Sequence, residues 1–246
     1  MVENQTYNED LYELREREEV AKHPCSLTLT LFLFFSYCLI EQLFLVPPAQ
    51  KLQRAIEKKD LKTMGTLIAN GALNEMSERQ KGKLLLKAYR GNKKEIAQLL
   101  LSKGIDANSI CADTPPQTLL IHCLSTADLP EWVELLLSHG ANPTLMTTGM
   151  HETALHIAIN KNRRATKSLI EKAKDLDVQN RFGETPLHRA VFKERLDIVP
   201  ILLARGAKTT IKDGKGLTPV DYLEEYSTGE EIKVLFEKTS PLLEKE

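Results

Sequence analysis

The chain has 246 residues and a formal net charge of −1 at pH 7, so no overall positive field favours binding to nucleic acid. Its four cysteines show neither a C-x-x-C pair nor the spacing of zinc ligands, which argues against a cysteine-based metal site and favours a reduced, intracellular setting. The length fits one or two ordinary domains, or a linear array of repeats that contact only their neighbours.

Residues 1–24 are acidic and poor in apolar side chains. A secretory signal begins with positive charge, so this start argues against one. We expect a solvated tail or a charged helix, in which Glu18 and Lys22 have the i,i+4 spacing of a side-chain pair.

Residues 25–48 form the most apolar stretch, which carries no charge until Glu41 and ends at Pro47 and Pro48. We expect a hydrophobic helix that the prolines terminate. Two interpretations stay open. Residues 26–46 either associate with a membrane, with the basic residues that follow placing the rest of the chain in the cytoplasm, or they cover apolar surface at the open end of a repeat array.

Residues 49–240 repeat with a period of about 33 residues, and Thr185-Pro186 is matched one period later by Thr218-Pro219. We expect an array of about six repeats with degenerate ends, numbered one to six in chain order. Their expected ranges are 49–77, 78–110, 111–147, 148–179, 180–212 and 213–240. Residues 241–246 would then be a C-terminal tail.

The repeat is most complete between residues 180 and 207. Gly183 permits a turn, Thr185 can cap a helix with its side-chain oxygen, and Pro186 suits the first helical position. A second apolar run follows and ends at Gly206, a residue type favoured just after a helix. Helices of about ten residues are too short to persist alone in water, so the repeat must stack on neighbours.

With its Thr-Pro-Leu-His string, the leucines of its second helix and its closing Gly-Ala, this stretch resembles the ankyrin repeat family. The match is clear again at residues 131–142 and 148–178, and it weakens upstream, where the repeats lack a Thr-Pro opening. The resemblance implies an all-α solenoid of stacked helix-turn-helix units with hairpin loops. The hydrophobic segment would add an N-terminal helix.

Two positions recur through the array and are predicted to form its core, one aliphatic and one mostly small. The aliphatic position is held by Leu52, Leu85, Ile121, Leu155, Leu187 and Val220, and the small one by Ala55, Ala88, Leu124, Ala158, Ala190 and Leu223. Repeat three carries extra residues, so its loop over residues 113–117 is either a contact site or a spacer. Repeat six has Asp221 where a histidine is expected, and its second helix over residues 230–238 reads as a closing cap.

No catalytic, cofactor or metal site is predicted. His122, His156 and His188 are assigned to one repeat position, where stacked helices would hold them about 10 Å apart, too far to share one zinc ion. The resemblance implies instead that each histidine joins its own loop to the next repeat by hydrogen bonds. No nucleophile elbow, phosphate loop or H-E-x-x-H motif is present, which argues against an enzyme.

The resemblance further implies a concave face, built from loop tips and the exposed side of the first helices, that binds another protein. Several of its contact positions are apolar or aromatic beside Arg and Lys, as in interface hot spots. The implied partner-binding residues are Met150, Glu152, Asn160, Lys161, Arg181, Phe182, Glu184, Phe192, Lys193, Lys215, Leu217, Glu225 and Tyr226.

Two functional hypotheses follow. The chain is a non-catalytic, monomeric protein-interaction module with no cofactor and no nucleic-acid partner, tethered to a membrane if residues 26–46 associate with one. Alternatively, it is a targeting subunit or secreted effector whose repeats deliver another activity to a host or partner protein. The two share the same binding face.

Overall fold

The computed structural model describes residues 46–113, 115–225 and 234. The chain separates into two parts, Met1–Gln50 and Lys51–Glu246. Only residues 46–50 of the first part are described, so the predicted tail over residues 1–24 and nearly all of the predicted hydrophobic helix over residues 25–48 lie outside the described residues. The predicted second helix of repeat six and the C-terminal tail also lie outside them, apart from Val234.

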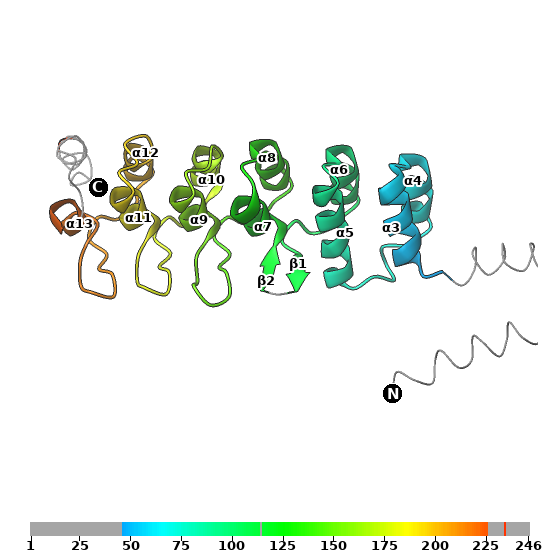
Figure 1. Cartoon of the computed structure of the whole chain (residues 1–246), viewed down its shortest axis with the longest axis horizontal. Coiled ribbons are helices and arrows are strands. Elements are labelled where there is room, and N and C mark those ends of the chain that lie inside the picture. Colours follow the sequence, from blue (N-terminus) through cyan, green and yellow to red (C-terminus); the bar gives the residue numbers. More distant parts are fainter. Residues whose placement is uncertain (1–45, 114, 226–233, 235–246) are drawn as a thin grey trace, which may run out of the picture. The chain divides into compact units, whose positions relative to one another are not determined.

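Short helices arranged in pairs follow one another along the array (Figure 1). The pairs are α3 (Pro48–Lys58) with α4 (Leu61–Ala69), α5 (Glu78–Arg90) with α6 (Lys94–Ser102), α7 (Leu119–Thr126) with α8 (Pro130–Ser138), α9 (Ala154–Asn160) with α10 (Thr166–Lys172), and α11 (Pro186–Phe192) with α12 (Val199–Ala204). Helix α13 (Asp221–Glu225) follows. Since α9 packs against α7, α10 and α11, its pair is stabilised by the repeats on both sides, and the predicted helical repeat fold is confirmed.

The first helices of repeats two, four and five begin at capping boxes. The hydroxyl oxygen of Thr185 accepts from the backbone N–H of His188, and the imidazole of His188 accepts from the backbone N–H of Thr185. Thr153 with His156, and Ser77 with Gln80, make the same reciprocal pair. The Thr185 cap and Pro186 at the first helical position agree with the sequence-based prediction.

Glycines in the left-handed backbone region follow four of the second helices. Gly71, Gly104, Gly140 and Gly206 have φ angles between 82° and 90°, where other residues are strained. The carbonyl of Leu202, inside α12, accepts from the N–H of Ala207 at 3.0 Å, so the reversal after this helix satisfies its last carbonyls. This agrees with the predicted role of Gly206.

The residues at the two predicted core positions are buried, except Val220. Val220 is 41% exposed, whereas Leu155 and Leu187 are at most 1% exposed. Val220 lies in the turn before α13 rather than inside a helix, and within the described residues no first helix of a later repeat covers it. The placement of Val220 in the core was therefore wrong.

The register predicted for repeat three was wrong by one residue. Thr118 caps α7 by accepting from the N–H of Ile121, as Thr185 does from His188, so Ile121 rather than His122 occupies the histidine position. Leu120 is then the equivalent of Leu187, and Cys123, fully buried, holds the small position instead of Leu124. The extra residues that precede α7 cause the offset.

Those extra residues form a hairpin of two short strands. Strand β1 (Ile110–Asp113) pairs antiparallel with β2 (Pro116–Thr118), and the register is irregular between Ile110 and Ala112. Strand β1 packs against α5 and α7, so the hairpin bridges two repeats. The predicted loop over residues 113–117 thus includes the facing ends of β1 and β2, and residue 114 lies outside the described residues.

Cationic side chains join successive pairs. Lys93 Nζ donates to the carbonyl oxygens of Ile56 and Glu57 at 2.6 and 2.9 Å, Arg163 Nε to that of Leu124 at 2.8 Å, and Arg195 Nη1 to that of Ile159 at 3.4 Å. The acceptors lie in the last turns of the preceding first helices, where the helix dipole is negative and carbonyls lack helical partners. Each cation therefore stabilises the contact with the repeat before it.

Candidate protein-binding face

The loops of repeats four, five and six are joined by their backbones. The N–H of Arg181 donates to the carbonyl of Met150 at 2.9 Å, and the N–H of Gly214 donates to the carbonyl of Phe182 at 2.8 Å. A Cβ atom on Gly183 would lie only 2.6 Å from the nitrogen of Gly214, so the loops approach too closely for a side chain there. The three loops therefore form one continuous edge.

Each loop is also held from within. Oδ1 of Asn180 accepts from the N–H groups of Phe182 and Glu184, and Oδ1 of Asp213 accepts from those of Lys215 and Leu217. Four bonds of 2.9 to 3.0 Å thus close two equivalent loops. Asn and Asp favour such turns because their short side chains reach the backbone two and four residues on.

A polar network lies beneath these loops. Arg189 forms an ion pair with Glu184, Nε to Oε2 at 2.9 Å, and its Nη2 lies 4.0 Å from Oε1 of Glu152. The Nε contact has the geometry of an ion pair rather than of an aligned hydrogen bond. The hydroxyl of Tyr222 donates to Oδ2 of Asp213 at 2.8 Å and lies 3.3 Å from Oε1 of Glu184. The network connects repeats four, five and six.

Burial and these acidic acceptors raise the pKa of Tyr222 well above its usual range. The phenol therefore stays protonated and keeps its donor role at ordinary pH. For Asp213, burial opposes ionisation, but the donors from Leu217, Tyr222 and Lys215 outweigh it and lower the pKa of this carboxyl. The loop bonds of Asp213 thus have a charged acceptor.

Two of the three histidines make the predicted bonds to the next repeat. His156 Nε2 lies 2.9 Å from the carbonyl oxygen of Glu184, and His188 Nε2 lies 3.1 Å from that of Leu217. Burial lowers the pKa of both, to about 4 for His156, because it disfavours the charged imidazolium. The neutral rings keep Nδ1 as an acceptor for the capping threonines. His122 instead contacts the side-chain amide of Gln117.

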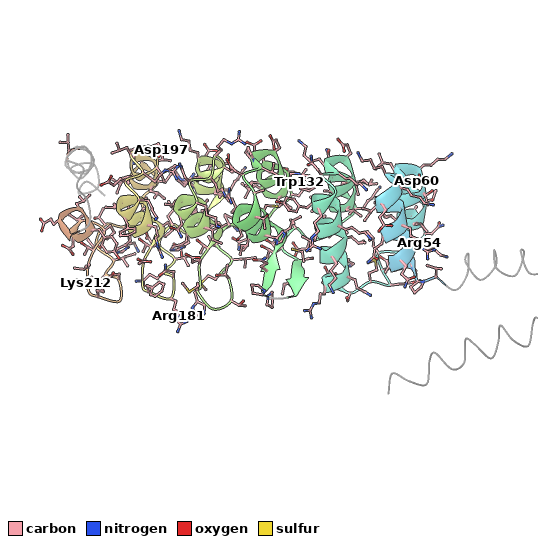
Figure 2. All side chains as sticks on the ribbon, viewed as in Figure 1. Arg54, Asp60, Trp132, Arg181, Asp197 and Lys212 are labelled. Carbon is pink, nitrogen blue, oxygen red and sulfur yellow. The ribbon has the colours of Figure 1, made fainter. Side chains whose placement is uncertain are left out.

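The exposed members of the predicted contact set lie on the loops and first helices. Phe182 is 50% exposed, Phe192 42% and Met150 41%. Arg181 projects from the loop of repeat five, away from the helices (Figure 2). Lys193 Nζ lies 5.4 Å from the ring centre of Phe192, and the rings of Phe192 and Tyr222 meet edge to face at 6.4 Å. Asn160, Lys161, Arg181, Lys193 and Lys215 are also exposed.

Other members of that set lie deeper. The carboxylates of Glu152 and Glu184 belong to the polar network, with side chains 18% and 15% exposed, and Leu217 is half-buried. Tyr226 and the side chain of Glu225 lie outside the described residues. Sequence reasoning missed Arg189, the centre of the network, because its partners come from loops that only the stacking brings together.

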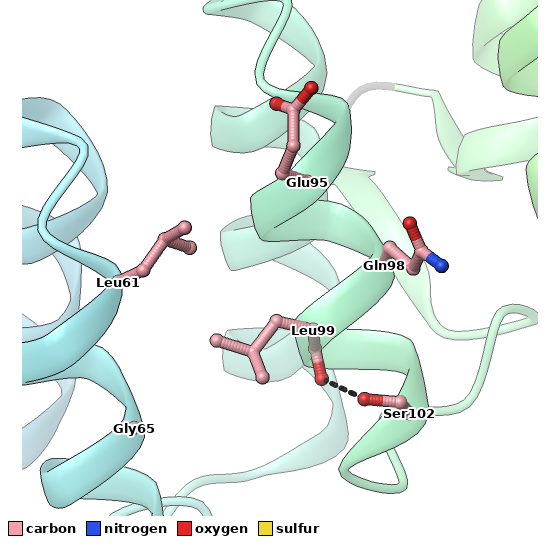
Figure 3. A pocket seen from close by; sticks show the side chains of 6 residues that line it. All are labelled: Leu61, Gly65, Glu95, Gln98, Leu99 and Ser102. Carbon is pink, nitrogen blue, oxygen red and sulfur yellow. Dashed lines mark hydrogen bonds between the residues drawn. The ribbon is translucent and has the colours of Figure 1, made fainter.

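A shallow, open depression of about 420 Å³ lies between α4 and α6 (Figure 3). These helices lie far from the loops of repeats four to six along the array (Figure 1). The lining residues of the depression are Leu61, Gly65, Glu95, Gln98, Leu99 and Ser102. Leu61 and Leu99 face one another across it, and it contains no cluster of catalytic side chains. Across the residues that the structure describes, no group of three or more His, Cys, Asp or Glu side chains could hold a metal ion.

Fold and surface together define a helical repeat protein in which a rigid stack carries exposed loops. Residues 120–213 match the family model for ankyrin repeats (3 copies). The chain is 33% identical over 162 residues to an ankyrin repeat protein of Fowlpox virus (strain NVSL), covering 62% of this chain and 46% of the relative. These comparisons support an ankyrin repeat family, with ankyrin repeats over residues 120–213, and such repeats imply a protein-protein interaction module.

In two further relatives, the match to this chain covers a smaller share of the relative's length. An ankyrin repeat protein of Rickettsia felis is 34% identical over 140 residues, which is 56% of this chain and 45% of that protein. The B-cell lymphoma 3 protein homolog of Mus musculus is 30% identical over 141 residues, which is 54% of this chain and 30% of that protein. The chain thus spans less than half of each of these relatives.

Among the described residues, no helix has the length and apolar character that crossing a bilayer requires. The segment that either associates with a membrane or caps the array, residues 26–46, lies outside them except for Val46, so neither interpretation is tested.

Proposed function

We propose that the array is a non-catalytic, monomeric module that captures another protein on the face formed by the loops of repeats four to six and the exposed side of α9 and α11. The observation that carries this proposal is the exposure of Phe182 and Phe192 on a scaffold that holds them in place. Aromatic side chains beside Arg and Lys are the residues that dominate interface energies. A fixed backbone lowers the entropy lost on binding.

The loop bonds explain why Phe182 would bind without a large rearrangement. Its carbonyl accepts from Gly214, its N–H donates to Asn180, and the preceding N–H donates to Met150. The ring therefore projects from a backbone that is fixed on both sides. Met150 and Arg181 flank it on the same edge, an apolar contact and a cation for a partner surface.

The test is photo-crosslinking from position 181 in the full chain. We expect Phe182→Ser with Phe192→Ser to reduce capture of the crosslinked partner by roughly tenfold or more, since each lost aromatic anchor costs at least about 1 kcal/mol. Leu61→Ser with Leu196→Ser is the matched control, because both leucines are exposed but belong to the second-helix side, Leu61 as the first residue of α4 and Leu196 just before α12. Capture that survives loss of both phenylalanines would refute this face.

Membrane tethering through residues 26–46 is a separate element of the proposal. Deleting residues 1–48 should release the array from membranes and leave the capture of a partner intact. If the array still sediments with membranes after the deletion, the anchor is refuted while the binding face stands.

The alternative function, delivery of another activity to a host or partner protein, draws support from the viral and rickettsial relatives.

A further inference from the structure

The first two repeats carry an excess of positive charge that the whole-chain balance conceals. Residues 51–110 contain thirteen Lys and Arg against six Asp and Glu, whereas residues 111–225 contain fourteen against fifteen. The array is therefore basic at one end and balanced over the rest of its described length. This asymmetry matters only if the cations share a surface.

The cations of α3 and α5 do share a surface. Arg54 and Lys58 are one turn apart on α3, and Lys83, Lys87 and Arg90 follow one another at i, i+4 and i+7 on α5. Four of the five are exposed and Lys87 is half-buried. We call these five residues the basic face.

An ion pair shows that the two halves of the basic face adjoin. Lys87 Nζ lies 2.6 Å from Oε1 of Glu57, which sits between Arg54 and Lys58 on α3. The pKa of Glu57 is lowered, first by its hydrogen bond and charge contact with Lys87 and further by Lys93 and Arg54. This one carboxylate is thus surrounded by cations from both helices.

The basic face continues the face proposed to bind a partner. Arg90 follows the buried Ala88 by two positions, as Phe192 follows Ala190, and Lys58 follows Ala55 by three, as Lys193 follows Ala190. In a stack of equivalent repeats, equivalent positions lie on the same side. Lys58 and Arg90 therefore lie, in repeats one and two, on the side that carries Phe192 and Lys193 in repeat five. Arg54 and Lys87 precede Ala55 and Ala88 by one position, as Arg189 precedes Ala190.

We propose that the basic face binds an acidic, Asp- and Glu-rich segment of the captured protein. This inference rests on the proposed function and adds the chemical class of the partner. A flat anionic membrane would reach the projecting cations but not the half-buried Lys87, which is locked against Glu57, whereas an extended acidic chain can follow the row from helix to helix. Such a contact is weakened by salt, because exposed charges are screened over about 8 Å at physiological ionic strength.

The experiment uses the full chain and a fluorescent glutamate-rich peptide, with binding followed by anisotropy. We expect Arg54→Glu, Lys58→Glu and Arg90→Glu together to weaken binding by roughly tenfold or more, since three surface ion pairs are lost and charge reversal adds repulsion. The control is Lys167→Glu, Lys172→Glu and Lys174→Glu, which changes the net charge equally on exposed residues of repeat four. The control should bind nearly as the parent does.

A neutral version, Arg54→Gln, Lys58→Gln and Arg90→Gln, covers the case in which charge reversal disturbs folding, and it should give an intermediate loss. Equal weakening in both reversal variants, no weakening in either, or no binding by the parent chain would overturn the inference. So would binding to phosphatidylserine vesicles, in place of the peptide, that is lost with the basic face.

The proposed function is tested separately. Phe182→Ser with Phe192→Ser should leave peptide binding unchanged within about twofold, because these residues lie in repeat five. If the basic face fails the peptide test, crosslinked capture through Phe182 and Phe192 still decides whether the loops bind a protein.

Discussion

Nε2 of His156 in repeat four lies 2.9 Å from the carbonyl oxygen of Glu184 in repeat five. The other ring nitrogen of His156 accepts from the backbone N–H of Thr153 at 3.3 Å and contacts its hydroxyl at 2.8 Å. One imidazole thus fixes the start of its own helix and the loop of the next repeat. His188 makes the same two connections one repeat further on.

Replacing His156 by Leu should destabilise the array by about 2 kcal/mol or more, because the buried N–H of Thr153 and carbonyl of Glu184 lose their partner. Urea unfolding measures the change. His151→Asn is the matched control, since His151 is exposed and has a positive φ of 53° that Asn tolerates. Equal losses in the two variants would contradict the double role of His156.

The lowered pKa of His156 should make the stability of the array depend on pH. The folded pKa of His156 is about 4, below its unfolded value of about 6.5, so the unfolded state takes up protons first as the pH falls. The stability that follows from keeping His156 neutral, about 3 kcal/mol of unfolding free energy at most, is fully present above about pH 6.5 and is lost as the pH falls toward 4. His188, whose pKa is also lowered, acts in the same direction.

Unfolding free energies measured between pH 7 and pH 4.5 test this prediction. In the His156→Leu variant the decline over this range should be shallower than in the parent chain, because one of the two histidines no longer titrates. An identical decline in both proteins would show that His156 does not carry the linkage.

Gly183 and Gly206 both have positive φ angles, of 77° and 82°, but differ in their surroundings. A Cβ on Gly183 would meet the nitrogen of Gly214 at 2.6 Å, whereas a Cβ on Gly206 would have, among the described residues beyond its two chain neighbours, no heavy atom within 4 Å. Gly206→Ala should therefore cost about 1 kcal/mol of backbone strain, and Gly183→Ala clearly more because it also separates two loops. Thermal unfolding measures both, and equal costs would contradict the close approach of the loops.

Trp132 is 1% exposed, packs edge-on against Tyr89 with ring centres 5.2 Å apart, and donates from Nε1 to Oδ1 of Asn92 at 3.0 Å. Trp132→Ala should cost about 3 to 5 kcal/mol. Asn92→Gly keeps the positive φ at this position and removes only the acceptor, so it should cost about 1 to 2 kcal/mol. Urea unfolding compares them, and a cost for Asn92→Gly as large as that for Trp132→Ala would contradict this account.

Local chemistry made much of the fold predictable from the sequence. The Thr185 cap, Pro186 and the glycine after α12 act within a few residues, so their types alone indicate where helices begin and end. The register of repeat three was not predictable in this way. Its β-hairpin shifts α7 by one residue, and Ile121, His122, Cys123 and Leu124 include three apolar side chains that fit a buried stripe in either register.

The proposed binding face was predictable only in outline. Loop tips such as Phe182 follow from the repeat pattern, but Glu152 and Glu184 resembled surface residues until stacking brought Arg189 between them. The basic face is reflected in the excess of Lys and Arg over Asp and Glu in residues 51–110, which the net charge of −1 for the whole chain conceals. Counting charge repeat by repeat would have revealed it.

Hydrogen-deuterium exchange of the full chain, with and without a captured partner, tests the central claim most directly. The account predicts that bound partner slows exchange in the loops around Met150 and Arg181 and in α11, while α10 and α12 exchange as in the free protein. Protection confined to α10 and α12, with the loops unchanged, would contradict it.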